Sequence, residues 1–406
     1  MNPCVSMSLW LARRHSFKTA VLFSLAQVLG GACAALLFFR LARAEVDLGP
    51  KPGFGWWEVM VVECLYTSMI CFVYLNCAAS RGNNPVGDQN CFAGLAVGLC
   101  YVAAGYASMQ VSGTVMNPAI AIGVQIADLG DQFHMRWGFD YLPMEIFGGF
   151  LAVSAYRLVR PKEMDTSLLF EADDSRWQGS TSAKVMAEFI GTFYVIFTKA
   201  LNNIGASKAE AWSVAACLAA MVYSLRNVSG GFFNPAVSLS TALCSRRICT
   251  VRNACLYTGA QILGGLSASA MYSAVHHGAR IEVRPPKTFS NRLGAIIVGE
   301  VVFTCLISYV VLATSVLAPF RTRTRQNNVA GLAVGMCIAV GGFAVGNISG
   351  AVLNPATALG FTGLNFIGGD MFQSAVFAYI VYQVGGAILA SGFFFLTHAD
   401  FYRDVP

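Results

Sequence analysis

Asparagine followed by proline occurs five times in the chain, and four of these copies, all except Asn84-Pro85, lie at nearly constant spacing. The intervals between the four asparagines are 115, 117 and 120 residues (117 − 2, 234 − 117 and 354 − 234), and the last three copies share the pattern Ser-Gly-x-x-x-Asn-Pro-Ala. Asparagine is a good N-cap, and proline suits the first helical position because its missing N–H would be unpaired there anyway. Each copy therefore predicts the start of a helix. The motif residues are Asn2, Pro3 and Cys4; Asn117, Pro118 and Ala119; Asn234, Pro235 and Ala236; and Asn354, Pro355 and Ala356.

The apolar run after each motif is short, for example 119–127 and 236–243. A helix of this length crosses only about half of a bilayer. Its free N–H groups are tolerated in mid-membrane only where they face protein or a water-filled cavity. Two such half-helices that meet head to head bring their positive dipole ends and two asparagine amides to one place, where a neutral solute finds hydrogen-bond donors and a cation is repelled. Ordinary turns between helices are the alternative, but turns do not repeat at fixed spacing inside apolar sequence.

The elements that must position these motifs are membrane spans. Of the 406 residues 56% are hydrophobic and 12% are charged, and the mean hydropathy is +0.58; a soluble domain carries about twice that charge. We predict an all-α polytopic membrane protein with about ten transmembrane helices and four Asn-Pro half-helices. The expected spans lie near 17–41, 56–79, 91–109, 141–159, 184–201, 210–226, 254–276, 293–317, 329–346 and 372–397.

The repeat period of three spans reverses the membrane orientation at each copy, which predicts inverted repeats with a pathway at the bilayer midplane. We divide the chain into an incomplete N-terminal unit (1–160), a linker (161–182), a complete C-terminal unit (183–397) and a short tail (398–406). The N-terminal unit lacks its first two spans, and because its motif follows Met1 directly, we expect two apolar spans to be encoded upstream.

The positive charges favour one orientation. Basic residues gather in short loops at Arg13, at Arg246 and around Arg321–Arg325, which favours a cytoplasmic location for these loops, the linker and the tail. This distribution explains the cations better than nucleic-acid binding does. No phosphate loop, catalytic triad, paired-carboxylate site or metal-ligand spacing of cysteines occurs in the sequence, so we expect no enzymatic activity, no cofactor and no metal.

The C-terminal unit resembles a complete member of the aquaporin (major intrinsic protein) family. The likeness lies in Ala-Glu-Phe-Ile-Gly-Thr-Phe (187–193), Ala-Gln-Ile-Leu-Gly-Gly (260–265), Gly-Glu-Val-Val-Phe-Thr (299–304) and Tyr-Gln-Val-Gly-Gly-Ala (382–387). The N-terminal unit resembles the same family from inside its first half-helix onward. The resemblance implies a passive channel in the lipid bilayer for water or small neutral solutes, and a tetrameric arrangement of units. It also implies that Glu63, Glu188 and Glu300 hold the half-helix loops through hydrogen bonds, with a proton relay as the alternative role.

In this family an arginine normally follows the second Asn-Pro-Ala and forms a narrow filter with aromatic residues. The equivalent positions are Ile120 and Thr357 here, and the family's spacing implies that the other filter positions are Val214, Gly342 and Ala351 in the C-terminal unit and Gly105 and Thr114 in the N-terminal unit. The C-terminal filter is therefore expected to be small, weakly polar and uncharged. That favours passage of glycerol, urea, ammonia or peroxide besides water, unless Phe343 or Phe232 fills the space.

Two alternatives from other functional classes stay open. A non-conducting junction or scaffold protein could keep the same fold, and an ion-conducting relative is conceivable because the filter arginine is missing. Osmotic swelling of vesicles distinguishes the first from a channel, and current recordings identify the second.

Overall fold

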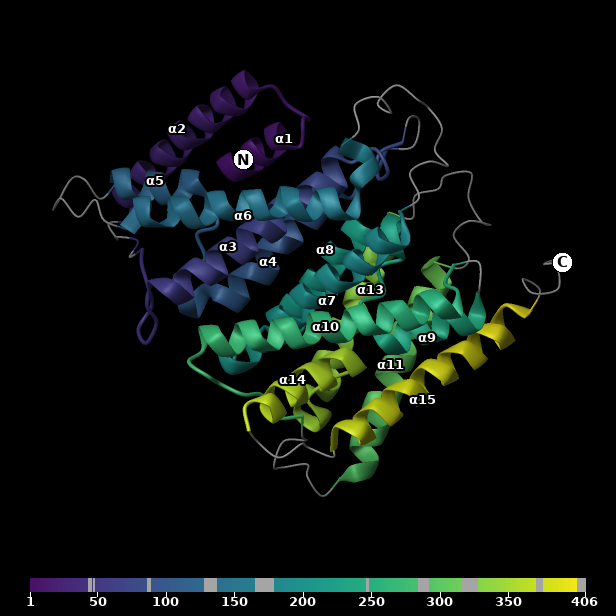
Figure 1. The fold of residues 1–406 in the computed structure, drawn as a ribbon. Helices are drawn as coiled ribbons and strands as arrows, with labels where there is room; N and C mark the ends of the chain where they lie inside the picture. The colour runs from purple at the N-terminus through teal and green to yellow at the C-terminus, as the bar shows by residue number, and fades with distance from the viewer. Residues whose placement is uncertain are drawn as a thin grey trace.

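The computed structural model describes residues 1–42, 46, 48–85, 89–127, 137–164, 179–245, 248–283, 292–315, 328–369 and 375–399. Over these residues the chain is helical and contains no strand (Figure 1). Most of the linker (165–178), Arg246 and Arg247, Arg321–Arg325 and the last residues of the tail lie outside this description.

Four short helices begin at the prolines of the Asn-Pro motifs, as the motifs predict. They are α1 (Pro3–Leu11), α5 (Pro118–Ala127), α9 (Pro235–Cys244) and α14 (Pro355–Ile367). The described residues also form ten helices of 19 to 26 residues, within a few residues of the expected spans. They are α2 (Phe17–Ala42), α3 (Trp56–Tyr74), α4 (Ala93–Ser112), α6 (Trp137–Val159), α7 (Thr181–Ile204), α8 (Glu210–Ser229), α10 (Val251–Val275), α11 (Leu293–Ser315), α13 (Ala330–Ser349) and α15 (Ala375–Thr397).

Eight of the long helices are apolar enough to cross a membrane by length and composition. The two that are not among them are α7 and α10. Helix α7 carries three charged residues, Lys184, Glu188 and Lys199, and α10 is rich in serine, tyrosine and glycine. Two of their polar side chains, Glu188 and Gln261, are fully buried and face protein rather than lipid.

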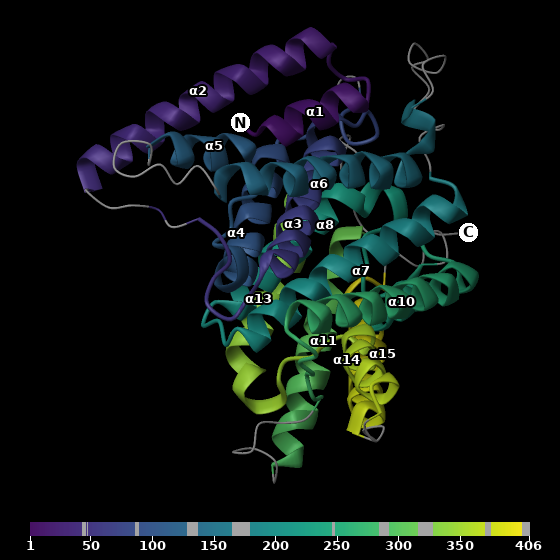
Figure 2. The ribbon, with the colours of Figure 1, turned by 60° about the vertical axis from the view of Figure 1, so that its left-hand side comes forward.

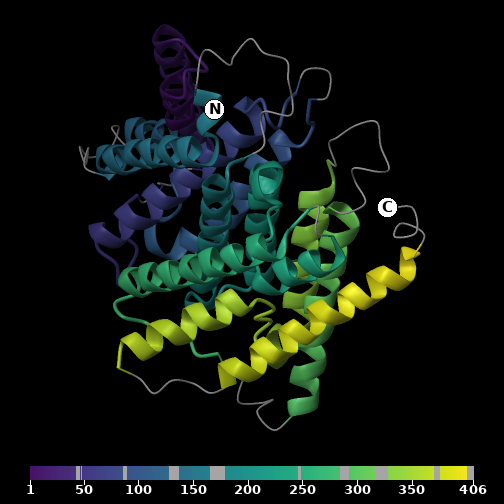
Figure 3. The same ribbon diagram turned by 45° about the vertical axis from the view of Figure 1, so that its right-hand side comes forward.

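In the C-terminal unit the long helices pack in three pairs, α7 with α10, α8 with α13 and α11 with α15. The half-helix α9 packs against α10, α11 and α15, and α14 packs against α10 and α15. Helices α14 and α15 lie on the side of the molecule that is farthest from α1 and α2 (Figure 3). This arrangement holds the starts of α9 and α14 inside the helical bundle, where their capping asparagines Asn234 and Asn354 are buried.

The N-terminal unit repeats part of this arrangement. Helix α3 packs along α6, α2 packs along α5, and α1 lies between α2 and α6. Helix α2 forms the outer edge of the molecule (Figure 2). Only Ala20 and Ala32 of its 26 residues are buried.

The two units meet where α4 packs along α8, so that α8 has α13 as one neighbour and α4 as another. Buried hydrogen bonds also join the two units, for example one between α4 and α8 and two between α3 and α7. Ser213 Oγ donates to the Ala103 carbonyl at 2.8 Å, Ser68 Oγ pairs with the Tyr194 hydroxyl at 2.6 Å, and the Tyr66 hydroxyl pairs with Thr198 Oγ1 at 3.1 Å.

A buried ionic cluster joins the N-terminal unit to the first residues of the linker. Glu163 lies 2.6 Å from Arg14 Nη2 and 3.2 Å from Arg160 Nη1, and it accepts a hydrogen bond from Ser80 Oγ. Burial opposes ionisation of this carboxyl, but the two guanidinium groups and the hydrogen bonds together lower the pKa of Glu163 below its ordinary value. The cluster ties the end of α6 to the end of α1.

Candidate functional site

The half-helices of the C-terminal unit start with the capping geometry that their sequence predicts. Asn234 has an extended backbone (φ −153°, ψ 121°) and its Oδ1 accepts a hydrogen bond from the Ala236 N–H at 2.9 Å. Asn354 does the same with the Ala356 N–H at 2.8 Å. Each cap satisfies one of the N–H groups that a helix end leaves unpaired.

The two helix starts face each other. Asn234 Nδ2 donates to the Leu353 carbonyl and Asn354 Nδ2 donates to the Phe233 carbonyl, both at 2.9 Å. Each asparagine therefore binds the residue that precedes the other asparagine, which is the symmetry expected of an inverted repeat. A side-chain amide has two N–H groups, so each amide retains one donor beyond this bond.

The N-terminal unit contains the same junction. Asn2 Nδ2 donates to the Met116 carbonyl at 2.7 Å, and Asn117 Nδ2 donates to the Met1 carbonyl at 3.1 Å. The caps are also present, with Cys4 N–H donating to Asn2 Oδ1 and Ala119 N–H donating to Asn117 Oδ1. Four asparagines thus form two reciprocal pairs, one in each unit.

The loops that precede the asparagines are strained. Before Asn354, left-handed backbone occurs at Gly350 (φ 85°), Ala351 (φ 43°) and Leu353 (φ 51°). Residues with a Cβ rarely adopt this conformation. The fully buried Glu300 holds the loop by accepting the Val352 N–H on Oε1 at 3.0 Å and the Leu353 N–H on Oε2 at 2.8 Å.

Glu300 also accepts hydrogen bonds from Ser349 Oγ (2.6 Å) and from Gln383 Nε2 (2.9 Å), so four donors surround one carboxylate. The same set repeats in the preceding half of this unit. There Glu188 accepts from the N–H groups of Phe232 and Phe233, from Ser229 Oγ and from Gln261 Nε2. These carboxylates tie the strained backbone to the helix bundle, and their burial is tolerated because each has several hydrogen bonds.

Glu63 of the N-terminal unit has three of these four donors, which are Ser112 Oγ and the N–H groups of Val115 and Met116. The fourth is replaced by an acid. Helices α6 and α15 pack in the same register against α3 and α11, as two glycine contacts show. A Cβ on Gly148 of α6 would lie 2.5 Å from the carbonyl of Cys64, the residue after Glu63. A Cβ on Gly386 of α15 would lie 2.5 Å from the carbonyl of Val301, the residue after Glu300. Glu145, three residues before Gly148, therefore stands where Gln383 stands against Glu300.

Glu145 is fully buried, and neither of its oxygens has a hydrogen bond of ordinary geometry with the described residues. The groups facing it include the carboxylate of Glu63, the Asn117 N–H, and the thiols of Cys4 and Cys71. Two carboxylates in one buried place cannot both be ionised without a large cost. Glu145 is not among the residues predicted from the sequence, although its spacing to Gly148 matches that of Gln383 to Gly386.

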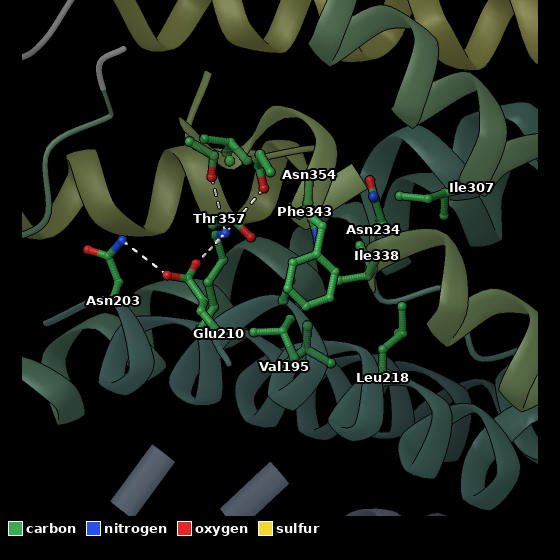
Figure 4. Close-up of a pocket in the computed structure, with 18 of the residues that line it drawn as sticks. Val195, Asn203, Glu210, Leu218, Asn234, Ile307, Ile338, Phe343, Asn354 and Thr357 are labelled. Carbon is green, nitrogen blue, oxygen red and sulfur yellow. Dashed lines mark hydrogen bonds and ion pairs between the residues drawn. The ribbon is translucent and has the colours of Figure 1, made fainter. Parts of the chain in front are cut away.

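A cavity of about 470 Å³ lies in the C-terminal unit at the junction of the half-helices. Asn234 and Asn354 line it, and so do the four residues that the family's spacing suggested as a filter, Val214, Gly342, Ala351 and Thr357. In Figure 4 the labelled side chains follow one another from Asn203 and Glu210, past Thr357 and Asn354, to Asn234 and Leu218.

Two features of the cavity bear on its width. A Cβ on Gly342 would lie 2.6 Å from the Ala211 Cβ, so the small size of Gly342 serves the close approach of α13 to α8 and does not by itself widen the cavity. Phe343 and Phe232, the two side chains considered as possible plugs, both line the cavity.

The four suggested filter positions carry no charge, but a charged side chain from another helix lines the same cavity. Lys199, on α7, lines the same cavity, and its ammonium group lies 3.2 Å from the Ala351 carbonyl oxygen, 3.3 Å from that of Gly350 and 3.0 Å from Glu210 Oε1. The sequence signal for Lys199 was a cation inside an apolar span, which is a functional candidate by default. The contact itself joins residues 152 positions apart and depends on packing.

Of the filter positions suggested for the N-terminal unit, Thr114 and Gly105 contact each other, whereas Ile120 lies apart from them. Thr114 (φ 62°) places its Oγ1 3.1 Å from Ser108 Oγ and 3.4 Å from the Gly105 carbonyl. Ile120 instead lines a separate cavity of about 240 Å³ between α2 and α5, together with Gly31 and Phe38.

Comparison with known proteins agrees with this architecture. The sequence model of the major intrinsic protein family matches residues 1–156, 176–362 and 297–403. Aquaporin NIP1-1 of Oryza sativa subsp. japonica is 32% identical over 216 residues, which cover 50% of this chain and 70% of that protein. Aquaporin AqpM of Methanothermobacter thermautotrophicus is 27% identical over 155 residues, covering 36% of this chain and 60% of that protein.

Among solved structures, the aquaglyceroporin from Plasmodium falciparum matches with a TM-score of 0.44 and 21% identity, covering 53% of this chain and 96% of that chain. The family match spans nearly the whole sequence and repeats along it. With its apolar helices and paired half-helices, this chain is an integral multi-pass membrane protein that belongs to the major intrinsic protein family, whose members are channels for water or small solutes and not enzymes.

Proposed function

We propose that the C-terminal unit is a passive pore for water and for small neutral solutes of the glycerol, urea, ammonia or peroxide type. The observation that carries this proposal is the cavity at which Asn234 and Asn354 converge from opposite half-helices. A solute there can accept hydrogen bonds from the two amides, while the positive ends of α9 and α14 disfavour cations.

The composition of the cavity supports passage of solutes larger than water. Selectivity in such pores comes from the width, the lining donors and acceptors, and the electrostatic barriers. Val214, Ala351 and Thr357 line the cavity with small side chains, and no arginine follows Asn354-Pro355-Ala356. Phe343 and Phe232 also line the cavity.

The placement of the pore in the membrane follows from the charges and the family. We propose that the linker 161–182, the basic loops and the tail face the cytoplasm. We also propose that the units arrange as in a tetramer, with each chain contributing two of them.

The pore assignment is tested by removing the amide donors and keeping the caps. The double variant Asn234→Asp/Asn354→Asp retains the oxygens that accept the Ala236 and Ala356 N–H groups. In stopped-flow swelling of vesicles it should lose most of the water and solute permeability of the native chain. Asn117→Asp, the same change in the N-terminal unit, is the matched control and should retain the permeability. Native permeability in a folded double variant would refute the assignment.

The width is tested with Thr357→Arg, which restores the residue type usual for the family at this position. The native chain should pass glycerol and urea, and Thr357→Arg should reduce their entry strongly while it reduces water flow less. A native chain that passes water and excludes glycerol and urea would show that the aromatic side chains keep the pore narrow.

A further inference from the structure

Three charged side chains outside the expected filter positions line the cavity, namely Lys199, Lys208 and Glu210. Lys199 lies in α7, and only 13% of its side chain is exposed. A buried ammonium group in a membrane-spanning helix is costly unless its donors are satisfied. All three of its N–H donors have acceptors, which are Glu210 Oε1 and the carbonyls of Gly350 and Ala351.

These acceptors fix where the charge lies. Gly350 and Ala351 belong to the strained loop that leads into α14, and Ala351 is one of the suggested filter positions. The ammonium group is thus held against the wall of the pore at the level of Ala351. A guanidinium extending from position 357 would instead occupy space inside the cavity that Thr357 lines.

Glu210 forms an ion pair with Lys199, but Lys208 also lines the cavity, so the three side chains together carry a formal charge of +1. Glu210 is the more exposed partner of the pair. Its side chain is 26% exposed, twice the 13% of Lys199, and Asn203 Nδ2 also lies 3.5 Å from its Oε2 (Figure 4). The carboxylate is therefore the more solvated partner, and solvent screens it more strongly. Glu210 acts as a positioning residue that aims the ammonium group at the two carbonyls.

On the basis of the proposed pore, we propose that Lys199 is the specificity-determining cation of the C-terminal unit. It supplies from α7 the positive charge that is absent after Asn354-Pro355-Ala356, and it excludes cations at the filter. Because its side chain is bound to the wall, this barrier leaves the lumen open to neutral solutes. A wide filter and exclusion of ions are then compatible in one pore.

The test separates the charge from the hydrogen bonds. Lys199→Gln keeps an amide that can donate to the carbonyls but removes the charge. In planar bilayers we expect its K⁺ conductance to exceed that of the native chain at least tenfold, while glycerol and urea entry into vesicles stays within about twofold. Lys199→Arg should remain impermeable to K⁺, and adding Thr357→Arg to Lys199→Gln should restore exclusion. Lys184→Gln, the same change on the same helix outside the cavity lining, is the matched control.

A second variant covers the case in which Lys199→Gln does not fold. Glu210→Gln leaves the ammonium charge without its counter-charge, so K⁺ should stay excluded and the ratio of Cl⁻ to K⁺ permeability should rise. The inference is overturned if Lys199→Gln excludes K⁺ as the native chain does while it passes neutral solutes, or if Glu210→Gln admits K⁺. A native chain that passes no solute at all would instead refute the proposed pore.

Discussion

The exchange of Glu145 for glutamine should stabilise the protein. In the C-terminal unit the corresponding Gln383 donates to Glu300 at 2.9 Å, whereas Glu145 presents a second carboxyl to Glu63 and has two unpaired buried oxygens. Glu145→Gln provides an amide donor and leaves one unpaired oxygen, as Gln383 itself does. A hydrogen bond to a charged group contributes about 1.5–3 kcal/mol, so the free energy of unfolding should rise by roughly that amount.

The measurement is thermal unfolding of the purified chain in detergent, followed by tryptophan fluorescence. The midpoint should rise by roughly 2–6 °C, because the shift per kcal/mol decreases with chain length. The reverse exchange, Gln383→Glu, places a second acid against Glu300 and should lower the midpoint by at least as much. If Glu145→Gln lowers the midpoint, or if both exchanges shift it in one direction, the equivalence of the two positions is wrong.

Three further changes probe other contacts. Glu300→Ala leaves four buried donors without their acceptor, at a cost of about 1–3 kcal/mol each. The variant should therefore not yield monodisperse protein on size-exclusion chromatography. A native yield of monodisperse protein would contradict the role of Glu300 in holding the loop before Asn354. The pKa of Glu163 is lowered in the folded state, so its contribution to stability is present above about pH 4.5 and is lost as the pH falls through the folded pKa. Acid should therefore lower the unfolding midpoint of the native chain more than that of Glu163→Gln. Parallel curves of midpoint against pH for the two proteins would argue against this contribution. Ser68→Ala removes the bond to Tyr194 across the unit junction and should cost about 1 kcal/mol in thermal unfolding, with no change in solute permeability.

Much of the fold could be predicted because its signals are local. An asparagine cap and a proline fix the start of each half-helix within two residues, and apolar length fixes a span. The positions of Val214 and Thr357 beside one cavity follow from the family's spacing. Lys199 could not be placed in this way, because its contact with Ala351 depends on how α7 packs against a loop 152 residues later.

Two other positions differ in how far the sequence alone could identify their roles. The match of Glu145 to Gln383 can be found from the repeat, since the glycine three residues later marks the register. The role of Gly342 cannot be found in this way, because a glycine beside a pore and a glycine at a helix contact look the same in sequence. Only the position of Ala211 distinguishes them.

The position of α8 between α4 and α13 has a consequence for the order of assembly. Ribosomal synthesis produces α4 before α8, and α13 only about 100 residues after α8. Helix α8 can therefore pack against α4 of the other unit, as well as against α7 of its own unit, before α13 is made. The N-terminal unit then acts as a template on which the C-terminal pore is assembled, a task that does not require it to conduct anything.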